Sequence, residues 1–290
     1  MKILLVPGNP GWAFDHRAKD LLSLSYDRIQ LEMKYVNRVK GSDRYQYDVI
    51  YPMSVNIAKK LHEKTNIPYK QMATGITSLR VLDKYNVDFL QLFRGLNTAS
   101  NEIVDMLKGH VHTNKTRVGV DPRHFKPAES KKKKRPFVVG WVGRIDQQNY
   151  RELKGYDLVI SALKDMNVNL QIRTFKDKVP RKEMVAFYQE LDCFICSSTS
   201  EHIPLPVLEA AACGVPIIST NVGIVPELIS DKRNGIIVKR DANAIKNAVQ
   251  TVKNNPEMKK QLSGNIRATI LEGWTLEKCK SDWEDFFSSL

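Results

Sequence analysis

The sequence has no long hydrophobic run. Nowhere in its 290 residues do about 18 consecutive apolar residues occur, the minimum for a membrane-spanning helix. The apolar stretch within residues 1–8 is too short for the core of a signal peptide, and no small-residue cleavage site follows it. We therefore expect a protein of the cytoplasm.

Cysteine is also scarce. Four cysteines in a chain of this length do not make a disulfide scaffold. Cys193 and Cys196 form a C-x-x-C pair, but they lie in an apolar run typical of a buried strand, and no second pair completes a zinc site. We interpret these thiols as core residues. We also identify no Asp-x-Asp metal site.

Acidic residues are few in the first half of the chain. The net charge is +13, and residues 1–135 hold 25 Lys and Arg against 13 Asp and Glu, whereas the remainder is nearly neutral. Five of the basic residues form the run Lys131–Arg135. The excess predicts a polyanionic partner for this half, either an anionic membrane surface or nucleic acid. A basic surface that only maintains solubility is the alternative.

Short apolar runs alternate with amphipathic stretches along the chain, a pattern typical of parallel sheets covered by helices. In the first half we predict strands at 2–6, 30–36, 47–51, 68–72, 87–92 and 110–113, and helices at 13–24, 54–64, 77–85 and 98–108. In the second half we predict strands at 136–142, 168–174, 192–196, 215–220 and 235–238, and helices at 158–166, 182–191, 206–213, 223–230, 241–254 and 275–287.

This pattern predicts an α/β protein with two Rossmann-like domains that face a cleft. The first domain is expected at 1–125, a basic linker at 126–136 and the second domain at 137–272. Ligands of such folds bind at the carboxyl ends of the strands.

Two carboxylates eight positions apart form the strongest local signal. Glu201 and Glu209 bracket a proline-containing loop that opens a helix of small residues at 206–213. A helix start beside a strand end offers backbone N–H groups and a positive dipole end to a diphosphate. Carboxylates suit sugar and ribose hydroxyls because they accept several hydrogen bonds. The alternative is an ordinary capped helix with two incidental glutamates.

The segment 200–229 resembles the E-x7-E signature of the GT4 family of retaining GT-B glycosyltransferases. Residues 142–163, with Val142-Gly143-Arg144 and Lys154-Gly155, resemble the family's G-R…K-G segment. Residues 118–127 resemble the family's entry to the interdomain linker. The resemblance implies a GT-B fold with a shortened first domain, and a last helix at 273–290 that crosses back to that domain.

The resemblance also implies a role for each matched residue. Arg144 and Lys154 would neutralise the donor diphosphate and stabilise the departing nucleotide. Glu209 would bind the ribose, and Glu201 the transferred hexose. Gly11, in the first loop, would allow close approach to the donor phosphates, although an ordinary tight turn is an equal alternative. Three backbone N–H groups would assist Glu201, around Ile203, Leu205 and Val207.

The sequence departs from the family pattern in three respects. His202 replaces a small residue, and Pro204 and Pro206 each remove a backbone N–H. The histidine that many members place near the sugar is missing from the matching stretch of the first half. Asp15 and His16, beside the glycine loop, are the remaining candidates there for contacts with acceptor or sugar, together with His202. A surface histidine is the simpler interpretation of His16.

The resemblance therefore implies a retaining, metal-independent transferase that moves a hexose to a cell-surface glycan or glycolipid. It implies no metal and no bound cofactor, which is consistent with the missing Asp-x-Asp site. A UDP-sugar is the favoured donor because it is the commonest, GDP-mannose is a second candidate, and residues 171–180 are expected to contact the base. Membrane lipid is favoured over nucleic acid as the partner of the basic half, which predicts peripheral association with the inner membrane face. The alternatives are a phage-type DNA glucosyltransferase and a non-catalytic nucleotide-sugar-binding protein.

Overall fold

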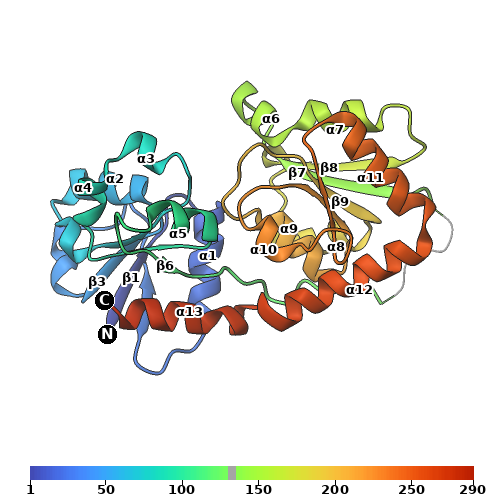
Figure 1. Ribbon diagram of the computed structural model, residues 1–290. Helices are drawn as coiled ribbons and strands as arrows, with labels where there is room; N and C mark the ends of the chain where they lie inside the picture. Colours follow the sequence, from blue (N-terminus) through green and yellow to red (C-terminus); the bar gives the residue numbers. More distant parts are fainter. Residues whose placement is uncertain (130–134) are drawn as a thin grey trace. The chain divides into compact units, whose positions relative to one another are not determined.

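The computed structural model describes residues 1–129 and 135–290, and the chain divides into two compact units (Figure 1). Unit 1 consists of Met1–Gly119 and Leu276–Leu290, and unit 2 of Val120–Thr275. Most of the basic run predicted as part of a linker lies outside the described residues. Its last member, Arg135, donates to Asp192 at 2.8 Å.

Unit 1 is built on parallel strands. β1 (Lys2–Val6) lies between β2 (Gln30–Met33) and β3 (Val49–Pro52), and β5 (Gly95–Thr98) lies between β4 (Ala73–Gly75) and β6 (Asn114–Lys115). A parallel bridge between Ile50 and Met72 joins the two groups. The strand order is therefore β2-β1-β3-β4-β5-β6, and the residues of β1 from Ile3 to Val6 are fully buried.

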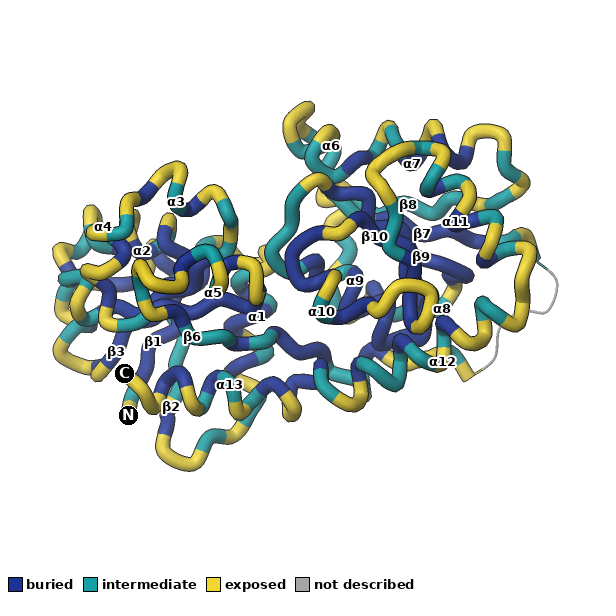
Figure 2. Tube along the Cα trace, in the orientation of Figure 1, coloured by how far each residue is buried: buried dark blue, intermediate teal, exposed yellow. Residues whose placement is uncertain are grey.

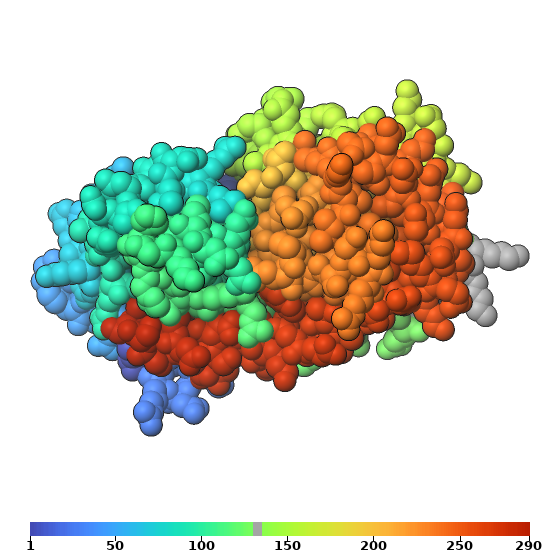
Figure 3. Space-filling model, in the orientation of Figure 1, coloured from blue at the N-terminus to red at the C-terminus, as the bar shows by residue number. Residues whose placement is uncertain are grey.

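Helices and short 3-10 turns connect the strands of unit 1. They are α1 (Ala13–Leu22), η1 (Gly41–Tyr45), α2 (Val55–Thr65), η2 (Tyr69–Gln71), α3 (Val81–Lys84), α4 (Val87–Gln91) and α5 (Asn101–Leu107). The last helix of the chain, α13 (Leu276–Ser288), also belongs to this unit and is red in Figure 3.

Aromatic side chains fasten α13 to unit 1. Trp283, Phe286 and Phe287 surround the buried Tyr51 of β3 edge-on, with ring centroids 5.8, 6.1 and 5.7 Å away. Edge-to-face aromatic pairs at such distances add to the stabilisation from area burial alone. Residues more than 200 positions from β3 therefore complete the core of the unit.

Unit 2 has one five-stranded parallel sheet of order β11-β10-β9-β7-β8. Its strands are β7 (Val138–Gly143), β8 (Asn169–Thr174), β9 (Cys193–Cys196), β10 (Ile217–Thr220) and β11 (Ile236–Val238). β9 and β10 are buried throughout, and Figure 2 shows the centre of this sheet as buried. The order reverses between β7 and β9, and ligands of open parallel sheets bind at the carboxyl ends of the strands at such a switch point.

The helices of unit 2 are α6 (Gln148–Lys154), α7 (Tyr156–Leu163), α8 (Met184–Gln189), α9 (Leu205–Ala212), α10 (Val225–Leu228), α11 (Ala242–Asn254) and α12 (Pro256–Gly273), with the 3-10 turns η3 (Phe175–Asp177) and η4 (Arg181–Glu183). Among the described residues, no helix is long and apolar enough to span a bilayer.

The predicted α/β architecture with two parallel-sheet units is confirmed, but several elements differ. The strand predicted at 87–92 is wrong: the Asn86 side chain accepts the Phe89 N–H at 2.9 Å, which caps a helix instead. The pattern did not predict α12 as a separate helix. The first unit ends at Gly119 rather than 125, since Arg267 donates to the carbonyls of Phe125 and Pro122 at 3.0 Å each within unit 2.

Candidate donor site in unit 2

Four predicted site residues lie at or just beyond the carboxyl ends of the unit 2 strands. Arg144 directly follows β7, and Lys154 ends α6, the helix that comes next. Glu201 lies in the loop after β9, and Glu209 in α9, which that loop opens. Because β7 and β9 are neighbours in the sheet, the two loops meet at the switch point.

Lys154 and Glu201 form an ion pair, Nζ to Oε1, with 25% and 13% of their side chains exposed. Ser198 Oγ donates to the same carboxylate oxygen at 2.6 Å. The backbone holds the two segments together, since the Thr199 N–H donates to the Leu153 carbonyl at 2.8 Å. The structure therefore brings a cation and a carboxylate of the predicted site into direct contact.

Two glycines in the left-handed region bracket the loop that carries Glu201. Gly155 has φ +69°, and a Cβ added there would clash with the Ser197 carbonyl oxygen and lie 2.9 Å from Ser197 Oγ. Gly223 has φ +54°, and a Cβ there would lie 2.8 Å from the Glu201 carbonyl oxygen. Both positions need glycine for conformation and for space. The loop is thus enclosed from two sides by backbone.

Arg144 is held by its own loop. Its Nε and Nη2 donate to the two oxygens of Asp146 at 3.0 and 2.7 Å. Its guanidinium lies 3.9 Å from the ring centroid of Tyr150 and 5.2 Å from that of Phe175. Bidentate pairing and stacking fix the plane of the guanidinium. Arg144 is consequently a cation of defined orientation at the end of β7.

Glu209 is 5% exposed and accepts hydrogen bonds on both oxygens. Arg181 Nε donates to Oε1 at 2.6 Å, and the Tyr188 hydroxyl donates to Oε2 at 2.8 Å. Burial, followed by the charge of Glu209, raises the pKa of Tyr188 well above its usual value, so its hydroxyl stays protonated. The paired guanidinium makes burial of this carboxylate tolerable.

Backbone hydrogen bonds at the start of α9 use N–H groups that the sequence analysis assigns to the donor. The Leu205 N–H donates to the Ile203 carbonyl at 2.9 Å, and the Val207 N–H to the Pro204 carbonyl at 2.8 Å. Pro204, at φ −73° and ψ 84°, is the centre of an inverse γ-turn. Two of the three predicted donor-binding N–H groups are therefore bonded within the loop. The carbonyl of His202 accepts the Ile224 N–H at 3.2 Å.

Residues 171–269 match the family Glycosyl transferases group 1. The matched region begins in β8, ends in α12 and contains both Glu201 and Glu209.

Curated relatives are similar over parts of the chain. An uncharacterized glycosyltransferase of Haemophilus influenzae is 33% identical over 127 residues, which are 42% of this chain and 35% of that protein. The putative colanic acid biosynthesis glycosyltransferase WcaL of Escherichia coli is 26% identical over 212 residues, 59% of this chain and 51% of that protein. The chain thus spans between a third and a half of the length of these relatives.

The fold is shared more widely than the sequence. A crystal structure of Anabaena HepE, in complex with UDP and glucose, superposes with a TM-score of 0.78 at 15% identity and covers both chains completely. At this identity the likeness concerns the fold. The region that matches group 1 glycosyl transferases therefore lies in a chain whose fold resembles that of HepE, and Glu201 and Glu209 are positioned as described above.

Unit 1 contains the remaining candidates. Gly11 has φ +75°, and a Cβ there would meet nothing within 4 Å, so the conformation alone requires glycine. Asp15 is fully buried and accepts the Gly11 N–H at 2.7 Å, Lys19 Nζ at 2.8 Å and the Tyr35 hydroxyl at 2.9 Å. Burial alone would raise the pKa of Asp15, but these hydrogen bonds outweigh it and lower the pKa. Asp15 therefore holds the glycine loop, and His16 is half-buried beside it.

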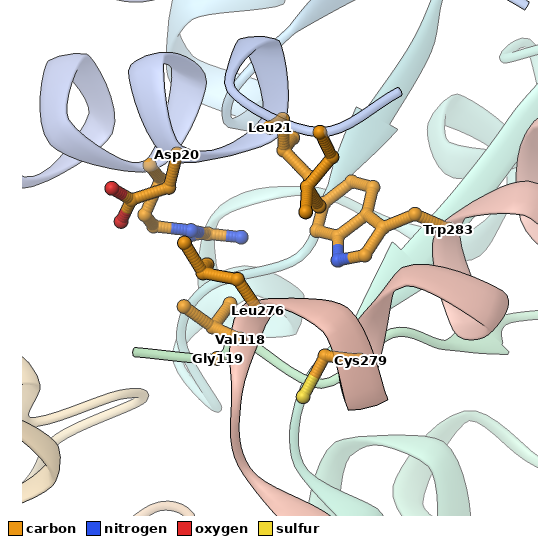
Figure 4. Close-up of a pocket in the computed structure, with 9 residues that line it drawn as sticks. Asp20, Leu21, Val118, Gly119, Leu276, Cys279 and Trp283 are labelled. Carbon is orange, nitrogen blue, oxygen red and sulfur yellow. The ribbon is translucent and has the colours of Figure 1, made fainter. Parts of the chain in front are cut away.

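A small pocket lies elsewhere in unit 1, between α1, the 118–119 connection and α13 (Figure 4). Its lining is mostly apolar, and the buried Nε of Arg17 has no hydrogen-bond partner. The labelled residues in Figure 4 are Asp20, Leu21, Val118, Gly119, Leu276, Cys279 and Trp283. None of the predicted donor-binding residues lines this pocket.

Sequence reasoning missed three side chains of the unit 2 site: Ser198, Arg181 and Tyr188. Ser198 lies three residues before Glu201, a spacing that favours a loop hydrogen bond. Arg181 and Tyr188 are 28 and 21 positions before Glu209. Both follow β8, which lies beside β7 in the sheet. The sequence alone does not give this strand order, so it does not place the two side chains near Glu209.

Proposed function

We propose that this protein is a retaining, GT4-type glycosyltransferase that moves a hexose from a nucleotide-diphosphate sugar, with a UDP-sugar favoured, to a cell-surface glycan or glycolipid. The observation that carries the proposal is the contact of Lys154 with Glu201 at the switch point of the unit 2 sheet. The match of the surrounding region to group 1 glycosyl transferases supports it, as does the UDP and glucose bound in the HepE structure.

In the proposed donor site, each charged side chain binds a different part of the donor. Lys154 and Arg144 bind the diphosphate, Glu201 accepts hydrogen bonds from hexose hydroxyls, and Glu209 accepts them from the ribose. Lys154 and Glu201 neutralise each other without donor. When the donor binds, the diphosphate competes for Lys154 while the hexose hydroxyls replace it at Glu201.

The proposed reaction is a same-face attack. The acceptor hydroxyl forms the new glycosidic bond as the bond from the hexose to the diphosphate breaks, and the departing diphosphate takes the hydroxyl proton. Arg144 and Lys154 stabilise the charge that develops on the diphosphate. In this proposal the two cations stabilise the diphosphate charge without a metal ion. We therefore expect turnover to be unchanged by EDTA.

The acceptor proposal rests on charge. Residues 1–135 carry a net charge of +12. This charge favours binding to an anionic membrane surface, where glycolipid acceptors lie. WcaL, one of the relatives, is named for the biosynthesis of colanic acid. Binding to anionic liposomes and to duplex DNA, each titrated with salt, separates this proposal from a nucleic-acid acceptor. Preference for the duplex would overturn the lipid assignment and leave the donor site untouched.

The first experiment is a donor panel of UDP-glucose, UDP-GlcNAc, UDP-galactose and GDP-mannose. Donor hydrolysis and thermal stabilisation are measured on the wild type, on Glu209→Ala and on the pair Arg144→Ala, Lys154→Ala. The control is Arg151→Ala, because Arg151 lies on the same helix as Lys154 but pairs with the exposed Asp157. We expect one donor to be hydrolysed and to stabilise the protein, with loss of both effects in the site variants only.

Binding without hydrolysis, even when liposomes are added, would favour the non-catalytic alternative. Normal hydrolysis by the Arg144→Ala, Lys154→Ala variant would contradict the proposed role of the two cations.

A further inference from the structure

We propose that Arg181 is a positioning residue for Glu209, and that it thereby sets the protein's preference for ribose over 2′-deoxyribose in the donor nucleotide. The inference rests on the proposed function, because it assumes that Glu209 receives the ribose. It adds a residue that lies outside the E-x7-E segment.

Arg181 reaches Glu209 from a different part of unit 2. It opens η4, after β8, whereas Glu209 lies in the middle of α9. The Nε–Oε1 distance is 2.6 Å, and 17% and 6% of the two side chains are exposed. The Arg181 guanidinium also lies over the Phe125 ring, 5.5 Å from its centroid. The planar guanidinium is therefore held between an aromatic face and a carboxylate, an arrangement that defines its orientation.

The opposite oxygen of Glu209 is held by Tyr188. This tyrosine is fully buried, and its hydroxyl donates to Oε2 at 2.8 Å. Because each oxygen accepts a described hydrogen bond, the orientation of the Glu209 carboxylate is fixed in advance. A carboxylate oxygen can accept more than one hydrogen bond, so a ligand hydroxyl can share it.

A ribose suits this arrangement because its 2′- and 3′-hydroxyls are adjacent donors. One hydroxyl can donate to each oxygen of a carboxylate of fixed orientation. A 2′-deoxyribose loses one hydrogen bond to a charged acceptor, and the affinity for the nucleotide is expected to fall about ten- to hundredfold.

Removal of Arg181 would take away the described guanidinium partner of the buried Glu209 carboxylate. The carboxylate would then rotate to find other donors or water, and its uncompensated charge would oppose the approach of a diphosphate. Both nucleotides would bind more weakly, but the ribonucleotide would lose more because only it uses both oxygens. The ratio of the two affinities therefore reports the positioning of Glu209.

The test is isothermal titration calorimetry on the full chain with UDP, GDP and their 2′-deoxy counterparts. The variants are Arg181→Gln, Arg181→Lys and, as the matched control, Arg151→Gln. Arg151 also lies over an aromatic ring, 4.5 Å from the Tyr156 centroid, and pairs with a carboxylate, but this carboxylate is the exposed Asp157. Arg181→Lys keeps the charge with a single donor and covers the case in which Arg181→Gln fails to fold.

We expect the wild type and Arg151→Gln to prefer the ribonucleotide by about ten- to hundredfold. In Arg181→Gln the preference should fall to about threefold or less, and Arg181→Lys should lie between. An unchanged ratio in Arg181→Gln or, if that variant is unfolded, in Arg181→Lys would overturn the inference, because a purely structural arginine weakens both nucleotides alike. A wild type that binds UDP or GDP without preference would overturn the inference and leave the proposed function standing. A wild type that binds none of them would remove the proposed function as well.

Discussion

Replacement of Gly155 by alanine tests whether the two sides of the unit 2 site depend on close backbone contact. Alanine at φ +69° costs about 1–2 kcal/mol in backbone conformation. The added Cβ would also clash with the Ser197 carbonyl oxygen, a backbone atom that cannot rotate away. Overpacking of this kind costs a further ~1–3 kcal/mol. The free energy of unfolding should therefore fall by about 2–5 kcal/mol.

Gly109 supplies the matched control. It has φ +83°, and a Cβ there would meet nothing within 4 Å. Gly109→Ala thus carries the conformational cost alone, about 1–2 kcal/mol. Chemical denaturation of the two variants measures both losses. Equal losses would refute the argument, because they would show that the contact with Ser197 constrains nothing.

The same substitution should affect the proposed donor site. Lys154 directly precedes Gly155, and Ser197 Oγ donates to the Lys154 carbonyl at 2.8 Å. Relief of the clash must move the Lys154 segment away from the loop of Glu201. A displacement of about 1 Å at a reacting group lowers turnover on the order of a hundredfold. Donor hydrolysis should fall accordingly in Gly155→Ala and remain normal in Gly109→Ala.

Three further predictions concern charged side chains of unit 1. Arg17→Met should raise the free energy of unfolding by about 1–3 kcal/mol, because Arg17 is 6% exposed and its buried Nε lacks a partner. Arg117→Met should lower the free energy of unfolding by about 1–3 kcal/mol, because it leaves the part-buried Asp282 without the guanidinium. Thermal unfolding gives both signs, and destabilisation by Arg17→Met would contradict the first. Burial alone would raise the pKa of Asp282, but the hydrogen bonds from Arg117 outweigh it and lower the pKa below 3.8. The stabilisation by Asp282 is therefore complete above the pKa of this group in the unfolded chain, and it is lost as the pH falls through the pKa in the folded protein. In urea titrations, the difference in free energy of unfolding between wild type and Asp282→Asn should shrink from pH 6 towards pH 2. A difference that is constant over this range would contradict the pairing.

The sequence predicted β9 and β10 of unit 2 well because these two strands are buried throughout. A buried parallel strand is a continuous apolar run, as at 192–196 and 215–220, and such runs are hard to confuse with loops. The run 87–92 misled the prediction since it is equally apolar and short. Its helical state depends on the Asn86 cap, which is a local signal, and on packing against other rings, which is not.

The candidate site could be predicted only in part. The resemblance to the GT4 family identified Arg144, Lys154, Glu201 and Glu209, and their roles remain predictions. The sequence did not indicate that Lys154 would contact Glu201, because the contact depends on β9 lying beside β7. For Asp15 the sequence suggested a contact with acceptor or sugar, because this carboxylate lies next to a glycine loop. In the structure Asp15 is buried, and its described hydrogen bonds hold the loop.

The position of α13 has a consequence for synthesis on the ribosome. Unit 1 begins to emerge first, but Trp283, Phe286 and Phe287, which surround Tyr51, are translated only after all of unit 2. At roughly 5–20 residues per second, the chain between Tyr51 and Trp283 takes on the order of ten to fifty seconds to make. Unit 2 is continuous and can close during this interval, whereas the apolar surface around Tyr51 stays uncovered. The nascent chain is therefore most exposed to chaperones and proteases in the half that was made first.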